Sequence, residues 1–429
     1  MSKSATAGKT RRVGAKPQQA KAVPSRLTVT KVGPIDAADV EFGDLTVIVG
    51  PQATGKSIFL QTLKLLLDRD HIHDAFTRHS VVFGGEAGAF LGGYFGKGMA
   101  AAWGEDSALR WNGQEQTLPG LAKPSRSKSK ALHERLFYIP AQRVMSLASG
   151  VPQNFRSFSY GDPYTLRYFA EAVRVFLEEE FGTRGELFPQ SNRLNEDLRG
   201  LIGTDIYGEG KLNAASKDFS HRMELRVPGH SEGQPFLAWS ACQREFTPLL
   251  LGLYWLCPVA TSLRRTGKDK GETIEWVVIE EPEMGLHPKG IVTVLLLVLE
   301  LMRRGYRVVL STHSPVVLDM VWALRELQTL DGSEADVRSL FGLAKNAYTQ
   351  RLARSALTRD CRVYYFDRHQ PVKDISRLDP GASSPDEAEW GGLVGFSSRV
   401  GEVLTAAVNR HDARISARAD RDAATNESQ

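Results

Sequence analysis

The residues from Gly50 to Ser57, GPQATGKS, have the types and the spacing that bind phosphate groups. A strand-like apolar run precedes them and a helix-like run follows, which is the context in which this pattern holds a nucleotide. Glycines let backbone amides turn around the phosphates, and the following helix directs its dipole at them. The alternative is a plain glycine turn between strand and helix. The residues expected to contact the nucleotide are Gly50, Gln52, Ala53, Thr54, Gly55, Lys56 and Ser57.

Acidic residues follow a second apolar run, WVVIEEPE, so Glu280 and Glu281 come at the carboxyl end of a predicted strand. Successive strand residues point to opposite faces, which lets adjacent carboxylates take different roles. We expect Glu280 to hold Mg²⁺ together with the Ser57 hydroxyl, and Glu281 to polarise the attacking water. A solvated acidic turn is the alternative for an isolated cluster of this kind.

The run VVLSTHSP repeats this arrangement and places His313 after a third apolar strand. A neutral imidazole there could donate to the terminal phosphate or orient the water. A lone histidine after a strand is more often a loop residue. We therefore give His313 a catalytic role only because it follows the loop and the carboxylates in this order.

The stretch LAWSACQRE precedes the apolar run FTPLLLGLYWLC, so Ser240 and Gln243 lie at a predicted helix start. A serine followed three residues later by glutamine is a common helix cap. The same spacing also suits a helix N-terminus that contacts a phosphate. The sequence leaves both interpretations open.

The order of these motifs resembles that of ABC-type ATPases. More narrowly, GPQATGKS, YIPAQR, SACQRE, IEEPEMGLHP and STHSP resemble stand-alone ABC ATPases related to the OLD family (AAA_15/AAA_21-like), many of which serve in bacterial anti-phage systems. The ATPase subunit of PARIS-type systems is one candidate within this group. The resemblance covers roughly residues 27–320.

The resemblance implies that Ser240 and Gln243 contact the ATP held by a second copy of the chain. Ala241 and Cys242 stand where glycines are usual, which puts a side chain where a phosphate would come near. The resemblance also implies that Gln142 in YIPAQR senses Mg²⁺, with Arg143 as an arginine common in this subgroup. Either could instead be a surface residue after a strand.

Strands alternating with helices predict an α/β fold, a P-loop NTPase of the ABC type with a mixed sheet and a helical or irregular insertion. Two strands are expected over 27–35 and 40–50, and a hairpin around ALRWNGQEQTL. Five segments are expected: a disordered basic tail (1–26), an ATPase lobe (27–83), an insertion with a helical subdomain (84–235), the part with the signature helix, carboxylates and histidine (236–345), and a strand and helix extension with a frayed tail (346–429).

The net charge of +4 arises in the first 26 residues, which carry seven basic and no acidic side chains. The remainder is net acidic, so the charge is no evidence that the body binds nucleic acid. The tail itself could touch nucleic acid or simply be solvated. Three dispersed cysteines and no long apolar run indicate a cytoplasmic protein without a membrane partner.

Together these observations predict an ATP- and Mg²⁺-dependent ATPase that assembles head to tail as a dimer or larger oligomer. The resemblance implies that it senses a phage-derived trigger and controls a separate effector, such as a Toprim-type nuclease. We expect no nuclease activity in this chain, since 114 residues follow Pro315 and Asp367 lacks evident partners. A transporter subunit fits less well, and a DNA-repair-like, DNA-associated ATPase is the main alternative.

Overall fold

The computed structural model describes residues 25–124, 133–181, 185–217, 220–257 and 274–426. A six-stranded sheet in the order β16-β15-β3-β14-β13-β6 forms its centre, parallel throughout except for the antiparallel edge strand β16. Its inner strands are short apolar runs that are buried on both faces, as expected for parallel strands. The strands are β3 (Leu45–Val49), β6 (Leu136–Ile139), β13 (Trp276–Glu280), β14 (Arg307–Ser311), β15 (Cys361–Tyr365) and β16 (Lys373–Asp374). The predicted α/β fold with a mixed sheet is therefore confirmed.

An antiparallel sheet in the order β2-β1-β4-β5 packs beside the central one. The predicted strand over 40–50 is wrong, because it is two strands that belong to different sheets and meet at Gly43 and Asp44. A side chain at position 43 would come within 2.5 Å of the Asp360 carbonyl, so this crossing requires glycine. The expected hairpin is present, but it pairs with β1 instead of standing apart as an insertion. The strands are β1 (Ser25–Val32), β2 (Ile35–Phe42), β4 (Trp103–Trp111) and β5 (Gln114–Gln116).

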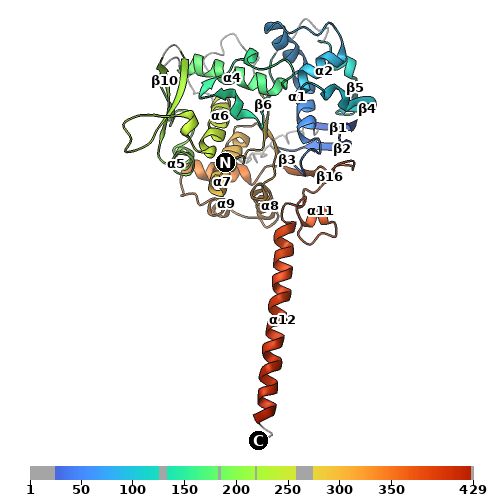
Figure 1. Cartoon of the computed structure of the whole chain (residues 1–429), viewed down its shortest axis with the longest axis vertical. Helices are drawn as coiled ribbons and strands as arrows, with labels where there is room; N and C mark the ends of the chain where they lie inside the picture. Colours follow the sequence, from blue (N-terminus) through green and yellow to red (C-terminus); the bar gives the residue numbers. More distant parts are fainter. Residues whose placement is uncertain (1–24, 125–132, 182–184, 218–219, 258–273, 427–429) are drawn as a thin grey trace, which may run out of the picture.

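Helices cover both faces of the central sheet (Figure 1). Alternate strand residues divide between two apolar clusters: Val277 and Ile279 pack with α4, α6, α7 and α8, whereas Trp276 and Val278 pack with α1 and the antiparallel sheet. The helices are α1 (Lys56–Arg78), α2 (Ala87–Phe95), α3 (Leu118–Leu121), α4 (Tyr164–Phe181), α5 (Glu196–Ile202), α6 (Ala241–Leu256), α7 (Pro288–Arg303), α8 (Pro315–Thr329), α9 (Glu334–Leu340), α10 (Ala347–Ala356), α11 (Pro385–Ala388) and α12 (Gly395–Asn426).

A third sheet, β12-β11-β10-β9, lies on the side of α6 that is away from the β2-β1-β4-β5 sheet, and β7 and β8 form a small ribbon. Single helical turns connect several elements. These remaining elements are β7 (Leu147–Ala148), β8 (Val151–Pro152), β9 (Gly185–Phe188), β10 (Lys211–Lys217), β11 (Ser220–Arg226), β12 (Gln234–Pro235) and the turns η1 (Met99–Ala102), η2 (Arg143–Ser146), η3 (Phe155–Ser157), η4 (Gly203–Tyr207) and η5 (Phe236–Ala238).

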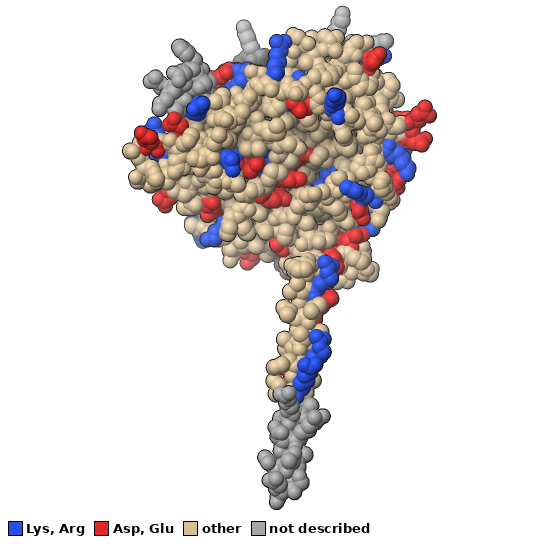
Figure 2. Space-filling model, in the orientation of Figure 1, with Lys and Arg blue, Asp and Glu red and all other residues tan. Residues whose placement is uncertain are grey.

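The C-terminal extension contributes to the core as well as to the surface. Strand β15 lies beside β3 within the central sheet, while α12 projects away from the body as a single long helix (Figure 1). The predicted basic tail lies outside the described residues, except for its last two positions. No helix within the described ranges is long and apolar enough to span a bilayer. On the face drawn in Figure 2, basic and acidic side chains are interspersed over the body.

Candidate functional site

The loop that joins β3 to α1 is held in its shape by two glycines. Gly50 has φ 141° and Gly55 has φ 94°, which are left-handed values that L side chains rarely adopt. A side chain at Gly50 would come within 2.0 Å of the Phe366 carbonyl, and one at Gly55 within 2.5 Å of Ile35. Ala53 also has a positive φ, 58°, which costs about 1 kcal/mol in a residue with a side chain. The loop is therefore fixed by its surroundings.

Lys56 is the first residue of α1 and is 7% exposed. Its Nζ donates to the carbonyls of Gly50 and Pro51, both at 2.7 Å. Burial lowers the pKa of Lys56 to about 8, while the charges of Glu281 and Glu280 raise it. A buried ammonium group thus lies on the loop carbonyls and close to both carboxylates. It is placed to meet an anion in this loop.

Glu280 ends β13 and is 2% exposed. Its Oε2 accepts from the Ala141 amide at 3.1 Å, whereas its Oε1 is buried and has no hydrogen bond to any described residue. Burial raises the pKa of Glu280, and interactions with the Ser57 hydroxyl, the Ala141 amide and Tyr138 oppose that rise. A buried carboxylate oxygen without a partner, next to a serine hydroxyl, suits Mg²⁺, which often takes one or two protein ligands and completes its shell with phosphates and water.

Glu281 follows with the left-handed φ of 44°, which turns the chain out of the strand. Its amide donates to the Ser311 carbonyl at 2.8 Å, so the end of β13 stays tied to the end of β14. Its Oε1 lies 3.7 Å from the His313 Nε2, and both side chains are about one-third exposed. The carboxylate and the imidazole thus face each other at the carboxyl edge of the sheet.

Glu283 takes part in the same arrangement, although sequence reasoning assigned it no role. Its Oε1 accepts from the Thr312 hydroxyl at 2.7 Å and from the His313 amide at 2.6 Å. Its other oxygen is buried without a hydrogen-bond partner in the described chain. The third acidic residue of EEPE therefore fixes the backbone that carries His313. The sequence shows that Glu283 is a third acidic residue in this cluster, but its partner His313 lies 30 residues away, so no local pattern predicts the contact.

Ser240 and Gln243 form a reciprocal cap at the start of α6. The Ser240 Oγ accepts from the Gln243 amide at 3.3 Å, and the Gln243 Oε1 accepts from the Ser240 amide at 3.0 Å. The start of α6 also lies against Gly285, where an added side chain would come within 3.1 Å of Glu245. Ser240 is exposed, so its hydroxyl hydrogen can still reach a phosphate outside this chain.

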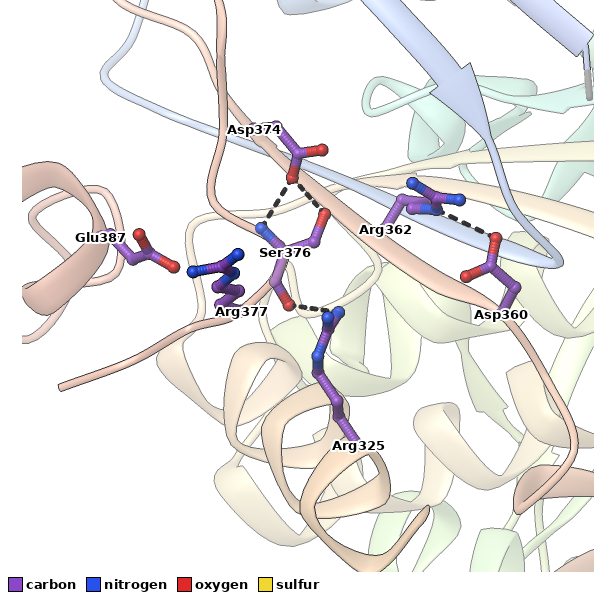
Figure 3. A pocket seen from close by; sticks show the side chains of 7 residues that line it. All are labelled: Arg325, Asp360, Arg362, Asp374, Ser376, Arg377 and Glu387. Carbon is purple, nitrogen blue, oxygen red and sulfur yellow. Dashed lines mark hydrogen bonds and ion pairs between the residues drawn. The ribbon is translucent and has the colours of Figure 1, made fainter. Parts of the chain in front are cut away.

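A surface cavity of about 500 Å³ lies away from these residues, between α8, β15 and the segment from β16 to α11 (Figure 3). Three arginines, three acidic residues and a serine line it, and several of them already bond to one another. None of the residues expected to bind nucleotide lines it. The lining residues are Arg325, Asp360, Arg362, Asp374, Ser376, Arg377 and Glu387.

Comparison with known families finds one match, over residues 165–319, to the family described as "AAA domain, putative AbiEii toxin, Type IV TA system". The match extends from α4 into α8, and thus includes Ser240, Glu280, Glu281 and His313 but not the loop at Gly50–Ser57. The comparison with curated proteins found no match.

Residues 165–319 are thus similar to an AAA-type domain, and they lie within an α/β fold with a mixed sheet. Similar solved structures include an SmcHead bound to the C-winged helix domain of ScpA (11% identity, TM-score 0.37) and the SMC head domain from Thermotoga maritima (13%, 0.31). A third is cbiO1 from Clostridium perfringens, part of the ABC transporter complex cbiONQ (11%, 0.30). Each covers 68% of this chain, and this chain covers 90%, 90% and 80% of them respectively.

The structure gathers some of the sequence-predicted residues and leaves others apart. Lys56, Ser57, Glu280, Glu281 and His313 interact with one another through the contacts above. Among the described residues, no side-chain hydrogen bond or ion pair joins Gln142, Ser240 or Gln243 to that group. Gln142 is exposed and directly precedes η2 in the chain. Its assignment to Mg²⁺ stays a prediction, as do the assignments of Ser240 and Gln243.

Proposed function

We propose that this chain hydrolyses ATP at a site formed by the loop from Gly50 to Ser57, Glu280, Glu281 and His313. One observation carries the proposal: the Lys56 ammonium, 7% exposed, lies on the loop carbonyls of Gly50 and Pro51 at the N-terminus of a 23-residue helix. A helix N-terminus, a lysine and backbone amides of a glycine loop attract phosphates. Glu280 has one carboxylate oxygen and Glu281 a partly exposed carboxylate available for chemistry.

The roles follow from the environment of each group. Lys56 exchanges its two carbonyl acceptors for phosphate oxygens when a nucleotide enters. Ser57 and the partnerless Oε1 of Glu280 would hold Mg²⁺, which neutralises phosphate charge when bound. Glu281 accepts a hydrogen bond from the attacking water. The imidazole of His313, held by Glu283 through its backbone, lies 3.7 Å from Glu281 and can donate to the terminal phosphate.

We further propose that a second copy completes the site through Ser240. The hydroxyl is exposed at the N-terminus of the 16-residue helix α6, so it has both the donor and the helix dipole that a phosphate requires. ATP would then act as a ligand that favours assembly. The control of a separate effector in anti-phage defence rests on family resemblance.

Steady-state hydrolysis of Mg-ATP by the purified chain tests the proposal. Lys56→Ala should lose nucleotide binding and turnover, because a buried cation facing the phosphates is removed. Lys345→Ala, on an exposed lysine, is the matched control and should keep both. Hydrolysis that is equal in Lys56→Ala and wild type would exclude this site. Stimulation of turnover by DNA would favour the DNA-associated alternative.

A further inference from the structure

Arg143 is the largest side chain that the described chain buries completely, with 0% exposure. Among the described residues its guanidinium bonds to no carboxylate, although burial lowers its pKa and the charges of nearby glutamates, Glu245 first, act to raise it. Instead Nε donates to the Glu245 carbonyl at 3.2 Å, Nη1 to the Glu280 carbonyl at 2.9 Å and Nη2 to the Glu281 carbonyl at 3.0 Å. Burying a charged group is costly unless its donors are satisfied. The three hydrogen bonds satisfy donors of this buried group and fix the positions of the three carbonyls.

The three carbonyls belong to two elements that the proposed reaction needs. Glu280 and Glu281 end β13, whereas Glu245 lies in the second turn of α6, the helix that begins beside Ser240. Arg143 itself follows β6, directly after Gln142. One planar side chain therefore joins the helix that would reach a second copy to the peptide that carries the proposed catalytic carboxylate.

The Glu281 peptide requires such support. Its φ of 44° is unfavourable for a residue with a side chain, and strained backbone persists only where its surroundings determine it. Its amide donates to the Ser311 carbonyl, and its own carbonyl accepts from Arg143 at 3.0 Å and from the Met284 amide of the following turn at 3.1 Å. Without Arg143 this carbonyl is held only by the Met284 amide of its own turn, so the turn can shift toward a relaxed conformation and move the carboxylate relative to His313.

We propose that Arg143 is a positioning residue that fixes the Glu281 peptide and makes hydrolysis depend on the position of α6. The inference rests on the proposed ATPase function. When a second copy engages Ser240 and displaces α6, Arg143 would transmit this displacement to Glu281, because its guanidinium bonds to both. Arg143 touches no nucleotide in this role, so it affects turnover more than nucleotide affinity.

Arg193 provides a matched control at the other end of the same helix. It is 5% exposed, and its Nη1 donates to the carbonyls of Tyr254 and Cys257, near the C-terminus of α6. Burial lowers the pKa of both arginines. Substituting lysine at either position keeps the charge but loses the planar fork of donors. Arg193 also pairs with Glu180 at 2.7 Å, so its variant removes at least as many contacts, and only the Arg143 variant alters Glu281.

The experiment compares Arg143→Lys, Arg193→Lys and the wild-type full chain. We expect kcat to fall about 100-fold in Arg143→Lys, the scale of a misplaced catalytic group, with the Kd for ATP within about 3-fold. Arg193→Lys should keep kcat within about 2-fold at a comparable thermal midpoint. Guanidinium ions at low millimolar concentration should restore part of kcat to Arg143→Ala. Equal kcat losses in the two lysine variants would overturn the proposal.

The rate of amide hydrogen exchange over residues 281–286 tests the role of Arg143 without depending on ATP hydrolysis. Exchange should be faster in Arg143→Lys than in Arg193→Lys, whether or not the chain turns over ATP. A wild-type chain without hydrolysis would refute the ATPase proposal, and the exchange rates would then decide whether Arg143 fixes this loop. Unchanged exchange in Arg143→Lys contradicts the inference.

Discussion

At the scale of single residues, the proposed site depends on groups held in costly states. Lys56 is a buried cation, Glu280 has a buried oxygen without a partner among the described residues, and Glu281 has a left-handed backbone. Each of these states lowers stability, and such costs cluster at functional sites.

Gly50→Ala should abolish nucleotide binding and destabilise the chain by about 2–3 kcal/mol, through the positive φ and the 2.0 Å approach to the Phe366 carbonyl. Gly84→Ala is the control, because Gly84 also has a positive φ, 60°, but no atom within 4 Å of the added carbon. It should cost about 1 kcal/mol and leave ATP binding intact. Thermal unfolding and binding of a fluorescent ATP analogue measure both effects. Normal ATP affinity in Gly50→Ala would contradict our account of the loop.

At the scale of elements, the sequence predicts the local part of the site and misses the long-range part. The loop flanked by β3 and α1, the strand before Glu280 and the capped start of α6 could be read from apolar runs and spacing. The split of residues 40–50 into two strands could not, because it depends on where Asp360 lies. The contacts of Glu283 and Arg143 join segments 30 or more residues apart, and no local pattern encodes them.

Helix α1 carries a buried titratable group that should make stability depend on pH. Burial, chiefly, lowers the pKa of His71 from 6.5 to about 3, so the unfolded chain binds a proton there before the folded one. Stability from this group is complete above pH 6.5 and falls by about 1.4 kcal/mol per pH unit between pH 6.5 and 3. His71→Gln should flatten this slope, whereas His411→Gln, on the exposed α12, should not. Equal slopes in thermal melts of both variants would show that His71 is not the titrating group.

The cap of α6 should matter to turnover as well as to stability. Ser240→Ala removes one half of the reciprocal cap and should cost about 1 kcal/mol. Ser333→Ala does the same to the cap of α9 and should cost about as much. Only Ser240→Ala should lower kcat, by about 10-fold or more, because it alone loses a donor to the phosphate. If kcat falls equally in both variants, Ser240 serves only as a helix cap.

At the scale of the whole molecule, the described chain combines an α/β body with a long projecting helix. Exposed apolar side chains recur along α12, including Phe396, Val403, Leu404 and Val408. Ser240 is exposed and forms no side-chain hydrogen bond with the Lys56 and Glu281 group in the described chain, so the composite site that we propose requires a second copy.

The chain alone should not cleave nucleic acid. Asp367 follows β15, and its carboxylate accepts from the adjacent Arg368 amide. Among the described residues, no cluster of three or more metal-ligating side chains occurs. The one pair of the type Asp-x-Asp after Pro315, Asp420 and Asp422, belongs to the end of α12, which projects away from the sheet that Asp367 follows, so it does not supply partners to Asp367. Incubation of plasmid with Mg²⁺ or Mn²⁺ checks this, and cleavage that is lost in Asp367→Ala would contradict it.

The most direct test is the native mass of Glu281→Gln with and without Mg-ATP, alone and combined with Ser240→Arg. Glutamine at position 281 should bind ATP without turnover, so a composite site predicts that Mg-ATP at least doubles the mass. Ser240→Arg places a bulky side chain at the interface and should return the protein to its nucleotide-free mass. A mass that responds neither to ATP nor to Ser240→Arg would contradict the account and leave a nucleotide-binding chain assembled through other surfaces.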